Sequence, residues 1–331
     1  MKVSFLVTYY NQEAYVKESI ESILAIDKDF EWEILVGDDG STDKTVDAVK
    51  EYINKYPGKI FLYVRDRNDG VIETVKRSSL NRLNLVKKMS GDYFCILDGD
   101  DYYCDVNFVQ DALDVFLHRD DISVVAFGFQ MFSTERGVTN KQYLTKKGDL
   151  STSHYLKHMY TPAGACVIKN DFDLGRIKYL ERIGFFDDND ILINSLNYGK
   201  MYAIDKIVYS YRQTDNSTYN AMGEAERALL NLQGCDVDRS YLPQYEKQIL
   251  RRNLGAIISL YKNRKNIKNV LSIDRELKYY NACDEIPNSY TVGYLDNYYR
   301  GNSANKKFSR LIIMLLIYYP IVTIRSMAKI K

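Results

Sequence analysis

Two aspartates spaced two positions apart, Asp98 and Asp100, follow an apolar run and are the first candidates for chemistry in this 331-residue chain. Side chains at this spacing point to the same side of an extended backbone, and Gly99 between them permits a sharp turn. A hard cation such as Mn²⁺ or Mg²⁺ binds one or two such carboxylates and completes its coordination with water and substrate phosphates. Residues 98–101 therefore predict a metal site that holds a diphosphate. The alternative is an ordinary turn with an acidic helix start.

Polar residues also follow two earlier apolar runs, at 8–11 and at 38–43. A carboxylate or backbone group of Asp38 or Asp39 would accept the imide N–H of a uracil ring, and Tyr10 would stack on a base. In the plainer interpretation, Ser41 or Thr42 only caps the following helix. The sequence contains no glycine-rich phosphate loop, so a metal is the natural substitute for holding phosphates.

The elements that must position these residues alternate between β-rich runs and segments of helical period, which is typical of a parallel sheet covered by helices. We expect strands at 3–7, 32–36, 60–64 and 93–97, separated by helices whose apolar faces carry Val16, Ile20, Ile23 and Leu24, then Val46, Val49 and Ile53, then Val75, Leu83 and Val86. The polar loops then lie together at the carboxyl ends of the strands, where such sheets bind ligands. The predicted class is α/β with a mostly parallel central sheet.

The pattern is mixed after residue 107. It predicts a helix with Phe108, Ala112, Leu113 and Phe116, a strand at 122–129, a polar stretch to about Lys157, strands at 164–168 and 203–211, and between these a helix at 191–198 closed by Gly199. The sequence after Thr218 is helical in pattern and rich in lysine and tyrosine, and it indicates no chemistry.

Composition narrows the classes of function. The 45 basic and 44 acidic residues nearly cancel, which excludes the global positive field of a protein that coats nucleic acid. Five scattered cysteines without a C-x-x-C pair indicate reduced thiols. The first apolar run is shorter than the roughly 7 to 15 residues of a secretory signal. Together these features predict a cytoplasmic location.

Four motifs, in this order, resemble glycosyltransferase family 2: V-T-Y-Y-N-Q-E at 7–13, D-D-G-S-T-D at 38–43, N-D-G at 68–70 and G-D-Y-F-C-I-L-D-G-D-D-Y at 91–102. The resemblance implies a Rossmann-like GT-A fold and transfer of a sugar with inversion from a nucleoside-diphosphate sugar, a UDP-sugar by preference, to a glycan or lipid-linked acceptor of a bacterial surface polysaccharide. It implies a metal at Asp100 and Asp98, and donor contacts by Thr8, Tyr10, Asn11, Asp38, Asp39, Asp98, Gly99 and Asp101.

Two later segments extend the resemblance. Residues 187–199 are similar to the family segment that carries the catalytic base, and alignment on Gly199 places Asp188 at that position, with Asp190 as the alternative. An acceptor hydroxyl needs such a carboxylate to take its proton, although carboxylates there also favour a helix start through its dipole. In Y-R-Q-T-D-N-S at 211–217, Arg212 is either a clamp for the donor diphosphate or an ordinary surface pair.

The expected organisation is a catalytic domain at 1–218 and a helical region at 219–331. In the tail, residues 306–331, an apolar run from Leu311 to Ile324 lies between cations. It is too short to span a bilayer and favours peripheral contact with the membrane, the alternative being a helix docked on the domain or in an oligomer. The competing functions are a nucleotidyltransferase with a related α/β core and an inactive module that binds sugar nucleotides.

Overall fold

The structure is a computed structural model that describes residues 1–249 except 72–73, 145, 159–160, 214–222 and 247. The predicted tail at 306–331 and most of the predicted helical region therefore lie outside the described residues. So does the end of the 211–217 motif. No helix among the described residues is long and apolar enough to cross a membrane.

The first third of the chain alternates strands and helices as predicted. It runs through β1 (Lys2–Tyr9), α1 (Val16–Leu24), β2 (Glu31–Asp38), α2 (Thr45–Lys55), β3 (Ile60–Val64), α3 (Thr74–Val86) and β4 (Tyr93–Asp98). The cap prediction for α2 is wrong, because this helix begins at Thr45 and neither Ser41 nor Thr42 caps it. Instead, the Asp43 carboxylate accepts the Thr45 backbone N–H at 3.0 Å.

The rest of the described chain contains more elements than its sequence pattern indicates. They are β5 (Tyr102–Tyr103), α4 (Phe108–His118), β6 (Ile122–Ser133), β7 (Gly137–Gln142), β8 (Gly148–Leu150), α5 (Thr152–His158), the 3₁₀ turn η1 (Ala163–Ala165), β9 (Cys166–Lys169), α6 (Leu174–Ile183), α7 (Asp188–Ser195), β10 (Lys200–Arg212), α9 (Glu224–Tyr241) and the 3₁₀ turn η2 (Pro243–Tyr245). The polar stretch before Lys157 thus contains two short strands. Its strand β7 is mostly exposed and has no apolar alternation to reveal it.

One sheet contains all the strands, in the order β3-β2-β1-β4-β9-β6-β10-β5, with β7 beside β6 and β8 beside β10. The long pairings are parallel: β1 with β2 and β4, β2 with β3, and β10 with β6. The short strands β5, β7, β8 and β9 pair antiparallel. The α/β class with a mostly parallel central sheet is therefore confirmed, and the antiparallel strands are short additions.

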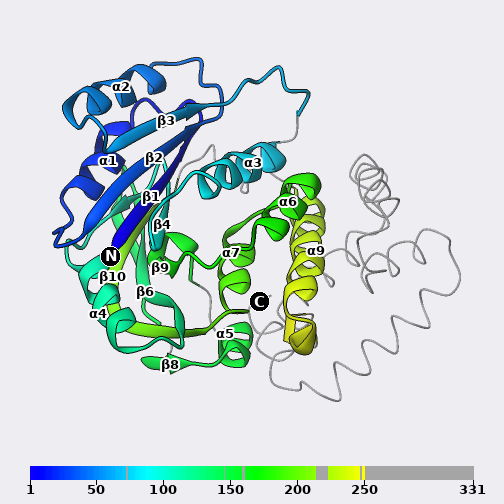
Figure 1. The fold of residues 1–331 in the computed structure, drawn as a ribbon. Coiled ribbons are helices and arrows are strands. Elements are labelled where there is room, and N and C mark those ends of the chain that lie inside the picture. Colours follow the sequence, from blue (N-terminus) through cyan, green and yellow to red (C-terminus); the bar gives the residue numbers. More distant parts are fainter. Residues whose placement is uncertain (72–73, 145, 159–160, 214–222, 247, 250–331) are drawn as a thin grey trace, which may run out of the picture. The chain divides into compact units, whose positions relative to one another are not determined.

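Helices cover both faces of the sheet (Figure 1). On one face, α1, α2 and α4 contribute Ile20, Val49 and Leu113 to a core with Phe5 and Val36. Helix α3 packs against β1 and β2. It buries polar side chains there, namely Arg77, Ser79 and Asn81 together with Leu83, Leu85 and Val86. Its polar positions therefore need partners inside the protein.

Helix α9 packs against α7, and both belong to one compact unit, Met1–Ile267 (Figure 1). The contact is close at Gly234, where an added Cβ would lie 3.2 Å from the Phe185 ring. The predicted boundary at residue 218 stays a prediction. The contact shows that the first helix after it packs on the α/β unit.

Candidate active site

The predicted loops do meet at one edge of the sheet. In the register of the sheet, Thr8 of β1 pairs with Gly37 of β2 on one side and with Asp98 of β4 on the other. The Thr8 hydroxyl donates a hydrogen bond of 3.2 Å to the Asp98 carboxylate. Because the three parallel strands end together, their polar residues form a single site there.

The aspartates of residues 98–101 have different environments. The Asp98 side chain is 36% exposed and accepts hydrogen bonds from Arg82 at 2.7 and 3.0 Å. Asp100 has no ion pair in the described part of the chain. Burial, followed by the negative charge of Asp98, raises the pKa of Asp100 to about 6. Asp101 is 2% exposed, and its carboxylate accepts hydrogen bonds from the Tyr209 hydroxyl and the Arg212 backbone N–H. Asp101 thus ties the loop to β10.

Position 99 has no room for a side chain. A Cβ at this position would lie 2.1 Å from the Tyr9 ring and 2.7 Å from the side-chain oxygen of Gln12. The chain does turn here, as predicted, with the Asp101 N–H donating to the Asp98 backbone oxygen at 2.9 Å, but the φ of Gly99 is not positive. The glycine instead allows β1 and the Asp98–Asp101 loop to approach each other closely.

Arg212 lies inside the protein, with 4% of its side chain exposed, so the alternative of an ordinary surface pair is wrong. Its guanidinium donates to the Asp100 backbone oxygen at 2.7 Å and to the Glu18 carboxylate. It also lies 4.9 Å from the centre of the Tyr15 ring. A clamp on the donor diphosphate stays a prediction, and it would require Arg212 to exchange these partners.

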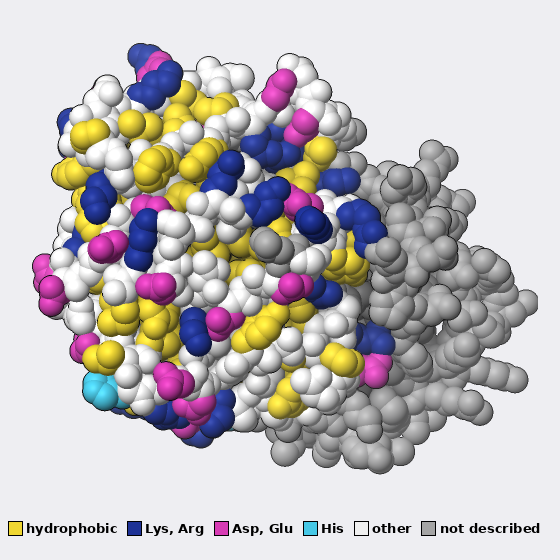
Figure 2. Space-filling model, viewed as in Figure 1, with side chains coloured by type: hydrophobic (Ala, Val, Ile, Leu, Met, Phe, Trp, Pro, Cys, Tyr) yellow, Lys and Arg dark blue, Asp and Glu magenta, His cyan; other side chains and the backbone are white. Residues whose placement is uncertain are grey.

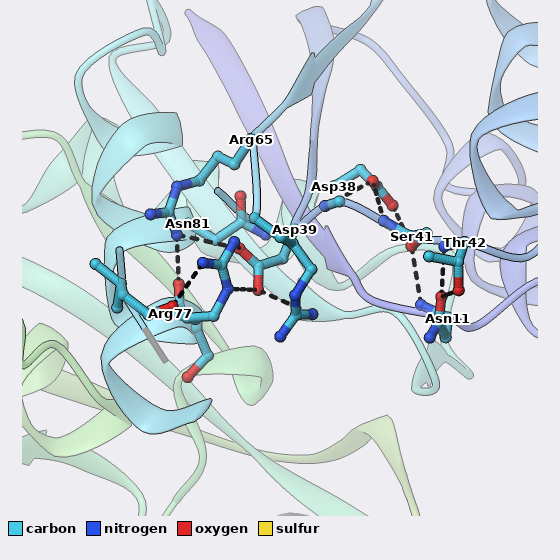
Figure 3. Close-up of polar contacts among 12 residues, drawn as sticks. Asn11, Asp38, Asp39, Ser41, Thr42, Arg65, Arg77 and Asn81 are labelled. Carbon is cyan, nitrogen blue, oxygen red and sulfur yellow. Dashed lines mark hydrogen bonds and ion pairs between the residues drawn. The ribbon is translucent and has the colours of Figure 1, made fainter. Parts of the chain in front are cut away.

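The carboxylate of Asp38 is fully used within its own loop (Figure 3). It accepts the backbone N–H groups of Gly40 and Ser41 at 3.0 and 2.8 Å and the Ser41 hydroxyl. Asn11, in the left-handed region with φ 50°, accepts the Thr42 N–H at 2.8 Å and donates its own N–H to Ser41. Asn11 and Ser41 therefore connect the loop after β1 to the loop after β2. A ligand at this position would contact the backbone of these two loops.

Asp39 lies among arginines (Figure 3). Arg77 donates two hydrogen bonds to its carboxylate, at 2.7 and 2.9 Å, and Arg65 donates a third at 3.1 Å. Arg67 lies 3.8 Å from Asp39, and its guanidinium carbon is 3.9 Å from the centre of the Tyr10 ring. The Arg67 guanidinium therefore covers one face of the Tyr10 ring, which was expected to stack on a base. Tyr10 itself is 41% exposed.

Replacing Arg77 by methionine is expected to lower the free energy of unfolding by about 3 kcal/mol, because a buried charge pair is broken and Asp39 loses two hydrogen bonds. Urea denaturation measures the change. Lys50→Met is the control, since Lys50 and its partner Asp47 are 59% and 77% exposed and their pair is worth about 0.5 kcal/mol. Equal, small losses in both variants would show that Arg77 does not hold the Asp39 loop.

Asp188 and Asp190 begin α7 but have different surroundings. Asp190 is 0% exposed, and it forms a reciprocal capping box with Asp187: its carboxylate accepts the Asp187 N–H and its N–H donates to the Asp187 carboxylate, both at 3.0 Å. Asp188 is half-buried. Burial raises its pKa to about 6, the positive charge of Arg82 opposes this rise, and the negative charge of Asp98 adds to it. Asp188 therefore interacts electrostatically with Arg82 and Asp98, whereas the charges that act on Asp190 are those of Asp187 and Asp238.

The donor set fits a magnesium or manganese ion. Burial raises the pKa of Asp100 and the negative charge of Asp98 adds to this rise, so a cation bound there would favour the ionised carboxylate. No cluster of three or more His, Cys, Asp or Glu side chains able to hold a metal occurs among the described residues. Mg²⁺ and Mn²⁺ need only one or two carboxylates besides water and phosphate oxygens.

The residues that sequence reasoning missed lie on α3. Arg77 binds Asp39, Arg82 binds Asp98, and Asn81 donates a 2.9 Å hydrogen bond to the Gly37 backbone oxygen. A signal was present, because the apolar pattern of this helix is interrupted by polar residues at positions that a helix of the predicted period would bury. Only the sheet register identifies their partners.

Comparison with known proteins identifies the family of this chain. Residues 4–175, more than half of the chain, match the model of the family described as glycosyl transferase family 2. The minor teichoic acid biosynthesis protein GgaB of Bacillus subtilis is 29% identical over 235 residues, which cover 69% of this chain and 25% of that protein. An uncharacterized protein of Mycobacterium tuberculosis is 26% identical over 169 residues, 50% of this chain and 46% of that protein. The chain thus spans about half or less of the length of these relatives.

The fold has a counterpart among solved structures. The S. aureus TarS 1–349 structure in complex with UDP-GlcNAc superposes with a TM-score of 0.52 at 19% identity, over 74% of this chain and 72% of that one. Such a likeness shows the fold, which is the GT-A arrangement expected from the four motifs. Because the family model matches more than half of the chain, including most of β1 and all of β2, β3 and β4, the chain belongs to glycosyl transferase family 2.

Proposed function

We propose that this chain transfers a sugar from a nucleoside-diphosphate sugar, a UDP-sugar by preference, to a hydroxyl of a glycan or lipid-linked acceptor, with inversion at the anomeric carbon. The observation that carries the proposal is the contact of Thr8 with Asp98 where β1 and β4 end side by side, and the electrostatic interaction of Asp188 with Asp98 supports it. The TarS complex with UDP-GlcNAc supports the choice of donor, and the teichoic acid relative supports a surface glycan as acceptor.

Asp98 and Asp100 would hold Mn²⁺ or Mg²⁺. When bound, such an ion supplies Lewis-acid stabilisation to the departing nucleoside diphosphate. Thr8, Tyr10, Asp39 and the backbone of the Asp38 loop would bind the nucleoside, and Asp188 would take the proton of the acceptor hydroxyl. Displacement from the face opposite the leaving group breaks the bond to the diphosphate as the new glycosidic bond forms, which inverts the centre.

A donor screen tests the proposal. Nucleotide sugars are incubated with the full chain and Mn²⁺, and release of nucleoside diphosphate is measured with and without EDTA. We expect metal-dependent hydrolysis of one UDP-sugar, together with a rise in melting temperature in the presence of UDP. Release of pyrophosphate from a nucleoside triphosphate would instead favour a nucleotidyltransferase. Binding of UDP without turnover on any donor or acceptor would favour the inactive module.

A further inference from the structure

Helix α3 connects the two sides of the site through its polar face. On the donor side, Asn81 binds the Gly37 backbone and Arg77 binds Asp39. On the acceptor side, the hydroxyl of Ser79 accepts the backbone N–H of Phe186 at 3.0 Å, two residues before Asp188. Ser79 and Asn81 are each 2% exposed. The helix therefore fixes both loops through buried hydrogen bonds, which are rigid because their groups have no water to exchange with.

Arg82 lies on the same helix. Its Nη2 is 2.7 and 3.0 Å from the two oxygens of Asp98, and its side chain is 14% exposed. Its Nε is buried and has no hydrogen-bond partner within the described residues. A buried guanidinium N–H without a partner is rare and costs free energy. Packing alone would not select an arginine at this position.

The same guanidinium also acts on the acceptor side. Arg82 interacts electrostatically with Asp188 and Asp187 as well as with Asp98. For Asp188, Arg82 is the largest influence that favours the ionised carboxylate, against burial and the neighbouring negative charges. One positive charge thus faces the loop that would bind the donor and the carboxylate that would accept the proton.

We propose that Arg82 is a positioning residue of the transfer reaction, which holds Asp98 through the two contacts of its Nη2 and directs its positive charge toward the start of α7. The inference rests on the proposed function. The positive charge of Arg82 holds Asp98 in place, and the same charge repels a metal ion bound by the Asp98 carboxylate. Removing the charge should therefore strengthen metal binding and weaken turnover.

The test compares Arg82→Met and Arg82→Lys with the unchanged chain. Binding of Mn²⁺ alone is measured by electron paramagnetic resonance of the free ion, and donor and acceptor kinetics are measured separately. For Arg82→Met we expect about tenfold tighter Mn²⁺ binding from the lost repulsion. We expect a fall in kcat of about a hundredfold from the misplaced carboxylates, with a smaller change in KM for the donor. Arg82→Lys keeps the positive charge but lacks the several N–H donors of the planar guanidinium. It should bind Mn²⁺ as the unchanged chain does and recover part of kcat.

Lys87→Met is the matched control, since Lys87 follows the same helix and its pair with Glu181 is exposed. It should change neither metal binding nor kcat. Weaker Mn²⁺ binding together with lower kcat in Arg82→Met would indicate a damaged site and overturn the inference, as would an unchanged kcat. If the unchanged chain turns over no donor, the proposed function fails. The Mn²⁺ measurement still tests the contact between Arg82 and Asp98 in that case.

Discussion

Replacing Asp100 by alanine is expected to reduce metal-dependent sugar transfer by about 10³-fold or more, and to raise the melting temperature of the metal-free protein at neutral pH. The loss of rate follows because a metal ligand supplies several kcal/mol of stabilisation to the developing charge of the leaving diphosphate. The gain in stability follows because burial and the charge of Asp98 raise the pKa of Asp100 to about 6. Its ionised form is therefore unfavourable in the folded chain.

The effect of Asp100 on the stability of the metal-free protein increases with pH. The folded pKa of Asp100 is about 6 and its ordinary value is 3.8, so the folded protein binds this proton more tightly than the unfolded chain. The destabilisation by Asp100 is fully present above about pH 6 and disappears as the pH falls toward 4. Melting temperatures in EDTA should therefore differ between Asp100→Ala and the unchanged chain much more at pH 8 than at pH 4.5.

Two control variants separate this role from general damage. Asp120→Ala removes an exposed carboxylate and should alter neither rate nor stability. Asp101→Ala removes the buried acceptor of the Tyr209 hydroxyl and the Arg212 N–H, and should lower the free energy of unfolding by about 1 to 3 kcal/mol. If Asp100→Ala behaves like Asp101→Ala, or if turnover survives both the substitution and EDTA, the metal role of Asp100 is wrong.

The donor half of the fold could be predicted because its signals are local. Strands β1, β2, β3 and β4 are short apolar runs, each followed by polar residues, and parallel strands place those residues at one edge. That rule predicts that Thr8 and Asp98 lie close together. In the structure, the Thr8 hydroxyl donates a hydrogen bond to the Asp98 carboxylate.

The partners of these residues could not be predicted in the same way, because they depend on contacts distant in sequence. Arg77 and Asp39 are 38 positions apart, and Arg212 reaches Glu18 across 194 positions. A helical pattern gives the face on which a side chain lies and carries no information about the charge it meets there. Arg212 was expected either to clamp the diphosphate or to form a surface pair. It lies buried against Glu18 and the Asp100 backbone, so the surface pair is wrong and the clamp stays a prediction.

The choice between Asp188 and Asp190 shows the same limit. Both lie just before the helix expected at 191–198, and the local sequence does not distinguish them. The structure separates them by their partners, since Asp190 completes a capping box with Asp187 while Asp188 interacts with Arg82 and Asp98. The capping box accounts for the carboxylate at position 190 without a catalytic role. Asp188 is left as the candidate base.

Replacing Asp188 by asparagine is expected to lower kcat by about 10² to 10⁴-fold while the chain keeps its affinity for UDP, because an amide cannot accept the proton of the acceptor hydroxyl. UDP binding by calorimetry and transfer rates with acceptor measure the two effects. Asp190→Ala is the comparison: it removes one side of the capping box and should lower stability by about 1 kcal/mol, with kcat largely kept below the melting temperature.

The pH profile identifies the base independently of the size of the loss. With a pKa of about 6, raised chiefly by burial, Asp188 is ionised at neutral pH and becomes protonated as the pH falls. Only the ionised form can accept a proton, so kcat/KM of the unchanged chain should fall about tenfold per pH unit below pH 6. At saturating Mn²⁺, which favours the ionised form of Asp100, the residual rate of Asp188→Asn should lack this fall. A fall that persists in Asp188→Asn and disappears in an Asp190 variant would transfer the role to Asp190, because a group that no longer titrates cannot set the profile.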